Sequence, residues 1–141
     1  MKLRNVPTRL AAGAFVLHSG IEKWSGGPEQ AAGIHGMAAG AFPVLQSFKP
    51  QDFLKLLSVG EVAVGTALLA PTVSPAVAGA ALTGFSGALV AMYLRTDALH
   101  KPGSVWPTQA GTGVSKDVWM LGIGVGLLVD ALTRREPASV E

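Results

Sequence analysis

Four long stretches of the chain consist mainly of alanine, glycine, valine and leucine, and short segments rich in proline, glycine and charged residues separate them. A helix that crosses a bilayer needs about 20 predominantly apolar residues. The stretches approach that length, and they predict spanning helices over residues 6–24, 52–70, 74–94 and 117–132. We therefore expect an all-α fold, a polytopic integral membrane four-helix bundle in which residues 1–141 form a single transmembrane domain.

The segment between the first two predicted spans, residues 28–48, has a different character. It is rich in alanine and glycine but only weakly hydrophobic, and it contains His35 and the helix breaker Pro43. Lipid does not satisfy the hydrogen bonds of a polar side chain or of a broken helix. We therefore predict an extra interfacial or re-entrant helix here, with a fifth span as the alternative.

The composition favours a membrane setting. Only 14% of the residues are charged, against about 25% in a typical soluble domain. Many of the 18 glycines lie inside the apolar stretches, where membrane helices use glycine for close packing. Cysteine is absent, which excludes disulfides and thiolate metal sites. No basic stripe with interleaved aromatic residues occurs, so the expected partners are the lipid bilayer and other membrane proteins rather than nucleic acid.

The first apolar stretch is preceded by basic residues, which are Lys2, Arg4 and Arg9. This pattern is similar to an export signal, but no small-residue cleavage site leads into a soluble segment, so we expect the stretch to remain as the first span. Basic residues ahead of a first span favour a cytoplasmic N-terminus. With four spans, both termini are then expected on the cytoplasmic side of a bacterial plasma membrane.

Several ionisable side chains fall inside or at the ends of the apolar stretches, where each needs a partner or a purpose. Antiparallel spans place His18 and Glu61 near the middle of the membrane, where they could pair. They place Arg9 and Asp130 near its cytoplasmic end, where a second pair could form. The charged residues expected at the outer mouth are Glu22, Lys23, Arg95, Asp97, Lys116 and Asp117. The predicted intramembrane polar core, or ligand or proton site, consists of His18, Glu61, Glu22, Lys23, Arg9 and Asp130.

A pair of Glu61 and His18 could relay protons, hold the polar end of a quinone or another small amphiphile, or act only as a structural clasp. No residue is predicted to be catalytic, because the sequence places no base beside any of its serines. No metal site is predicted, because the histidines and Glu61 lack ligand spacing. We expect no cofactor within this chain, although its polar core could take up quinone or lipid.

Small residues recur at helical spacing on the predicted spans, and such rows let neighbouring helices approach closely. The residues predicted to pack helices together are Gly13 and Gly20 on the first span, Gly79, Thr83 and Gly87 on the third, and Gly122 and Gly126 on the fourth.

Three motifs resemble those of DoxX-like membrane proteins. In the segment from Arg9 to Lys23, an arginine is followed by an apolar run, a glycine and a lysine. The second motif is Gly60-Glu61-Val-Ala-Val-Gly65, and the third is Lys116-Asp117-Val-Trp-Met-Leu-Gly122. The resemblance covers most of the chain, from residue 5 to residue 133.

The resemblance implies a four-helix inner-membrane bundle that associates with redox enzymes. The family takes its name from a small subunit of a quinol oxidase and thiosulfate–quinone oxidoreductase system. This sequence has no cysteine and no pair of haem ligands at matched depths, so another subunit would hold the electrons. We therefore expect a non-catalytic accessory subunit of a membrane-bound respiratory or redox complex. The alternative is a small-molecule, quinone or proton pathway that uses the intramembrane Glu/His pair, and an enzyme acting on quinone or lipid ranks third.

Overall fold

The structure, a computed structural model, describes residues 3–133 and confirms the all-α prediction, because every regular element in that range is helical and no strand forms. Lys2, one of the basic residues that predict a cytoplasmic N-terminus, and the C-terminal tail lie outside the described residues. The elements are η1 (Leu3–Asn5), α1 (Val6–Trp24), α2 (Pro28–Ala41), η2 (Pro43–Ser47), α3 (Pro50–Leu69), α4 (Pro75–Arg95), η3 (Asp97–Leu99), α5 (Thr112–Ser115) and α6 (Asp117–Leu132).

Prolines mark the beginnings of several helices. Pro28, Pro50 and Pro75 each occupy the first helical position, where the missing N–H costs no intrahelical hydrogen bond. Ser74 caps α4, and its hydroxyl oxygen accepts a hydrogen bond from the Val77 N–H at 3.2 Å. In the segment predicted as one interfacial or re-entrant helix, the chain instead forms α2 and then the short helix η2, which begins at Pro43.

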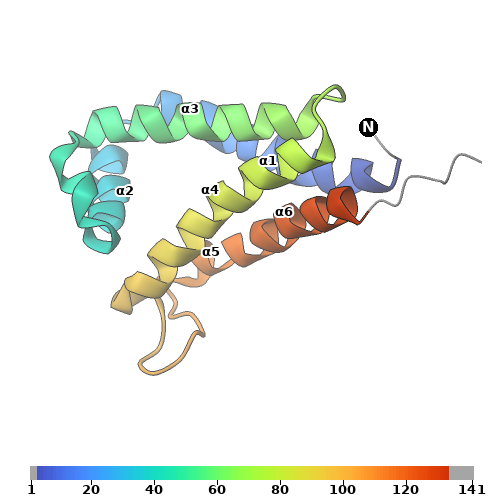
Figure 1. Ribbon diagram of the computed structural model, residues 1–141. Helices are drawn as coiled ribbons and strands as arrows, with labels where there is room; N and C mark the ends of the chain where they lie inside the picture. The colour runs from blue at the N-terminus through green and yellow to red at the C-terminus, as the bar shows by residue number, and fades with distance from the viewer. Residues whose placement is uncertain (1–2, 134–141) are drawn as a thin grey trace, which may run out of the picture.

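The helices are arranged as two pairs rather than as an even bundle. α1 packs along α3 and α4 packs along α6, whereas contacts between the pairs are few. Figure 1 shows that the pairs meet at the end where α3 turns into α4 and diverge towards α2. The molecule is therefore a wedge, closed at one end by contacts between the pairs and partly covered at the other by α2.

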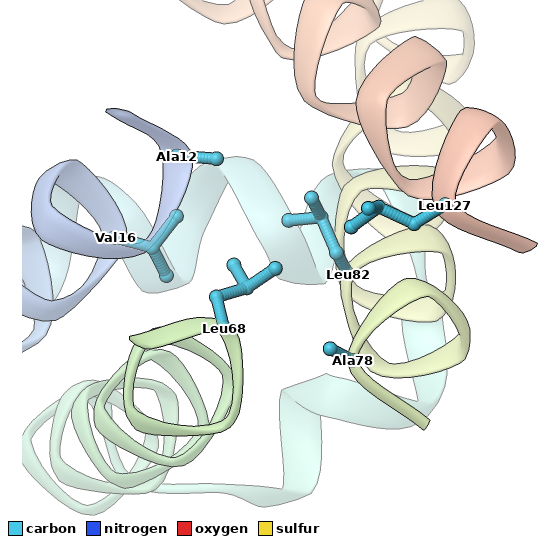
Figure 2. Close-up of a cluster of buried hydrophobic side chains, with 6 residues drawn as sticks. All are labelled: Ala12, Val16, Leu68, Ala78, Leu82 and Leu127. Carbon is cyan, nitrogen blue, oxygen red and sulfur yellow. The ribbon is translucent and has the colours of Figure 1, made fainter. Parts of the chain in front are cut away.

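The hydrophobic core lies where the two pairs meet (Figure 2). α1 and α3 contribute from one pair, and α4 and α6 from the other. The buried side chains of this cluster are Ala12, Val16, Leu68, Ala78, Leu82 and Leu127.

Two helical segments, Pro75–Arg95 and Thr112–Leu132, are long and apolar enough to cross a membrane. Only 28% and 11% of their most apolar windows are buried inside the molecule, so most of this apolar surface faces outward. The other two predicted spans, α1 and α3, have 19 and 20 residues, and every 18-residue window of each contains three charged side chains. The composition typical of a span is thus found in two of the four expected helices.

Candidate functional site

A cavity of about 510 Å³ lies between the two helix pairs and under α2, and we call it the wedge cavity. Its wall is mainly apolar, and side chains from α1, α2, α3, α4 and α6 contribute to it. The apolar side chains include Phe15, Ile34, Met37, Leu57, Phe85, Leu89, Met92 and Met120. Three ionisable side chains also line the cavity, which are Lys23, Glu61 and Asp117.

Lys23 and Glu61 form a largely buried ion pair across the contact between α1 and α3. The Lys23 ammonium donates hydrogen bonds to Glu61 Oε2 at 3.0 Å and to Ser19 Oγ at 2.6 Å. Their side chains are only 17% and 7% exposed. An ion pair removed from water in this way is favourable only when its geometry is good and further hydrogen bonds support it.

Close contact between α1 and α3 holds this pair in place. A Cβ atom on Gly20 would lie 2.9 Å from the Cβ of Glu61, so only glycine permits this approach. The Ser58 hydroxyl, one turn before Glu61, donates to the carbonyl of Gly20 at 2.6 Å. Backbone packing therefore positions the Cβ of Glu61, and Lys23 positions its carboxylate.

Asp117, the first residue of α6, brings a second carboxylate to the cavity from the opposite helix pair. It is half-buried, and the charges that act on it are those of Glu61 and Lys23. Within residues 3–133 its carboxylate accepts no hydrogen bond. Asp117 was expected only at a solvated outer mouth, and the motif that contains it gave no sign that it would face Glu61.

His18 does not pair with Glu61, so this part of the sequence prediction is corrected. Its Nε2 lies 3.4 Å from Glu22 Oε1, and both side chains are well exposed, at 71% and 67%. Successive residues of an α-helix are rotated by about 100° around its axis. His18 is two residues before Gly20, which contacts α3, and it therefore points away from that helix.

Arg9 has a different partner from the one predicted. Its side chain is completely buried, and the guanidinium donates to the carbonyls of Leu68 at 2.7 Å and of Ala67 and Ala70 at 2.9 Å each. It also donates to the carbonyl of Val73 at 3.0 Å. These carbonyls lie at and just after the end of α3, where the helix provides no N–H donors for them.

Asp130, the expected partner of Arg9, instead accepts hydrogen bonds from Arg4 and from Asn5 Nδ2, the latter at 3.0 Å. The observed partners differ from the predicted ones because the orientation of each helix about its axis decides which way its side chains point. Arg9 turns towards α3, whereas Asp130 on α6 meets the residues that precede α1.

The predicted packing residues are divided between contact and surface positions. Gly13 and Gly20 face α3, where an added Cβ would lie 2.9 Å from atoms of that helix. Gly79 faces α6, and Thr83 lies against Gly124. The remaining residues of the predicted rows make little or no close contact in the described chain, and these are Gly87, Gly122 and Gly126.

Comparison with family models, curated proteins and solved structures gives no match. The assignment of a function therefore rests on the residues and their geometry. Among the described residues, no group of three or more His, Asp or Glu side chains could hold a metal ion. The wedge cavity combines an apolar wall with one ammonium and two carboxylates, which is the composition of a site for a small amphiphile.

Proposed function

We propose that this chain is an integral membrane protein that binds a small amphiphilic molecule, of the quinone or lipid class, in the wedge cavity. The observation that carries the proposal is the set of ionisable side chains, Lys23, Glu61 and Asp117, on the wall of an otherwise apolar cavity. Ligand sites are usually apolar clefts in which a few polar groups orient the ligand. The apolar wall would hold a ring and tail, and the ionisable side chains would hold the head group.

Three of the six charged side chains of α1 and α3 are placed inward, as spans of a single transmembrane domain require, whereas Glu22, Asp52 and Lys55 are exposed. Arg9 is buried against carbonyls, and Lys23 and Glu61 face each other inside the wedge. The large side chains that these helices expose outside the cavity are mainly apolar, among them Leu10, Ile21, Leu56 and Val59. Charges placed inward and apolar groups placed outward are what lipid requires. We propose a bacterial plasma membrane location with both termini in the cytoplasm and α2 at the interface.

Ligand binding can be tested with a radiolabelled short-chain benzoquinone and its quinol, measured by equilibrium dialysis against the protein in nanodiscs of neutral lipid. We expect saturable binding. In Leu89→Trp the larger side chain should fill part of the cavity and abolish binding. Val129→Trp, on the exposed face of α6, should leave binding unchanged. The proposal fails if neither form of the ligand shows saturable binding to the unmodified protein.

A second candidate function is a non-catalytic accessory subunit of a membrane-bound respiratory or redox complex, as the DoxX-like motifs suggest. The exposed pair of His18 and Glu22 favours it. On a spanning helix, such a pair would face lipid unless another protein covers it, and lipid-facing ionisable groups are costly. A redox complex would also give a bound quinone its chemical role, with the electrons held by other subunits.

The exposed glycines of α6 offer a second docking feature. Gly122 and Gly126 line a hollow with Arg4 and Thr8, and a Cβ added to either glycine would meet no atom of the described chain within 4 Å. Gly126→Leu should reduce the recovery of partner subunits during purification in mild detergent. Gly84→Leu, on the open face of α4, is the matched control. A chain that purifies alone and monodisperse before any substitution would argue against this second function.

A further inference from the structure

We infer that the wedge cavity selects a neutral head group with hydrogen-bond donors, a diphenol such as a quinol, over the corresponding quinone. This inference rests on the proposed function, because it specifies which amphiphile the cavity takes. The observations behind it are the balance of charges in the cavity and the unused hydrogen-bonding capacity of its polar atoms.

Among the ionisable groups of the cavity, acceptors outnumber donors. It holds one ammonium, that of Lys23, and two carboxylates, those of Glu61 and Asp117. Two of the three ammonium protons are already donated, to Ser19 and to Glu61. An ionised carboxylate can only accept hydrogen bonds, and that of Asp117 receives none from the described residues. The Asp117 carboxylate therefore has free acceptor positions for a donor on the ligand.

A quinol supplies such a donor and a quinone does not. The two hydroxyls of a 1,4-diphenol lie at opposite ends of one ring. In the proposed pose one donates to Asp117 and the other lies near Lys23 and Glu61, which line the same cavity. The two carbonyls of the quinone are acceptors only, and one of them would face the Asp117 carboxylate. A polar group that is buried without a hydrogen-bond partner is desolvated without compensation, which weakens binding. The quinone should therefore bind less tightly than the quinol.

The charges of the cavity disfavour an anionic head group, and the cost of desolvation disfavours a cationic one. The carboxylate of a fatty acid would enter a site that already holds two carboxylates and one ammonium. A long-chain amine would complement Asp117, but it would place a second cation beside Lys23 and lose its own hydration in an apolar cavity. A neutral donor avoids both costs, which is why we assign the site to a diphenol rather than to an amine.

The experiment measures the affinities of a short-chain benzoquinol, its quinone, a fatty acid and a long-chain amine for the protein in anaerobic nanodiscs of neutral lipid. We expect the quinol to bind about tenfold more tightly than the quinone, a ratio equivalent to about 1.4 kcal/mol. In Asp117→Asn the amide can both donate and accept, so the ratio should fall towards one. The control, Asp97→Asn, changes an exposed carboxylate outside the cavity and should keep the ratio.

The outcomes separate the two proposals. Absence of binding by both quinol and quinone refutes the proposed function itself. Equal affinities for the two forms in the unmodified protein, or tighter binding of the amine or the fatty acid, overturn the present inference alone. A ratio that persists in Asp117→Asn also overturns it. Because the first comparison uses the unmodified protein, the inference can be tested even if the variant fails to fold.

Discussion

At the scale of single residues, the most informative side chain is Arg9. Its guanidinium donates to four carbonyl oxygens at and beyond the end of α3, so it replaces the N–H groups that a continuing helix would have provided. The positive charge also lies at the negative end of the helix dipole of α3. Arg9 thus joins the start of α1 to the turn that leads into α4.

Replacing Arg9 should strongly destabilise the fold. Arg9→Gln removes most of these hydrogen bonds and leaves buried carbonyls without donors, and we expect a loss of about 3 kcal/mol or more in the free energy of unfolding. Arg9→Lys keeps the charge but not the planar fork, so its loss should be intermediate. Unfolding of the detergent-solubilised protein measures both changes. Arg4→Gln, at a more exposed ion pair, should cost less than about 1 kcal/mol, and equal losses at Arg4 and Arg9 would contradict this role.

The ion pair of Lys23 and Glu61 should behave as a unit. Lys23→Met leaves a buried carboxylate without its cation, which costs about 3 kcal/mol in comparable sites. Adding Glu61→Gln removes that unpaired charge, so the double variant should recover much of the lost stability. A double-mutant cycle measures this coupling. Additive losses would show that the two side chains contribute independently, contrary to their 3.0 Å contact.

At the scale of elements, the sequence predicts the helices well because their boundaries have local causes. α1 and α6 begin and end at the expected residues, and the starts of α3 and α4 lie within two residues of the expected positions. Proline and the Ser74 cap act on their immediate neighbours, so their effects can be read along the chain. The contacts between helices depend on rotation around each helix axis. Small residues that look equivalent in sequence therefore differ, as Gly124 contacts α4 while Gly122 faces outward.

Two glycines of α3 provide a test of the contact between α1 and α3. A Cβ on Gly65 would lie 2.6 Å from the backbone nitrogen of Leu17, whereas a Cβ on Gly60 would meet nothing within 4 Å. We expect Gly65→Leu to separate α1 from α3 and to lower the thermal stability of the protein in detergent markedly. Gly60→Leu, on the same helix, should change it little. Equal effects of the two substitutions would mean that α1 and α3 are not packed as described.

At the scale of the whole molecule, the sequence identified groups that matter but not the way they combine. The apolar surroundings of Glu61 suggested that it would need a partner, and height along the spans pointed to His18. In the structure the partner is Lys23, which lies on the face of α1 that contacts α3. Asp117 joins this pair because it begins α6, which runs beside α4 and forms the opposite wall of the cavity, an arrangement that no local pattern encodes. The wedge cavity follows from pairing α1 with α3 and α4 with α6, a choice that depends on contacts far apart in the sequence.

The proposed orientation places the turn between α3 and α4 in the cytoplasm and the loop between η3 and α5 outside. Because the chain has no cysteine, single cysteines can report on both sides without background. Thr72→Cys and Gln109→Cys replace exposed residues in these two segments. In intact spheroplasts, a membrane-impermeant maleimide should label Gln109→Cys at once, and Thr72→Cys only after permeabilisation. The reverse pattern would invert the topology, while equal labelling of both, with the protein recovered in the soluble fraction, would exclude a membrane-spanning wedge and remove the basis for a lipid-phase ligand.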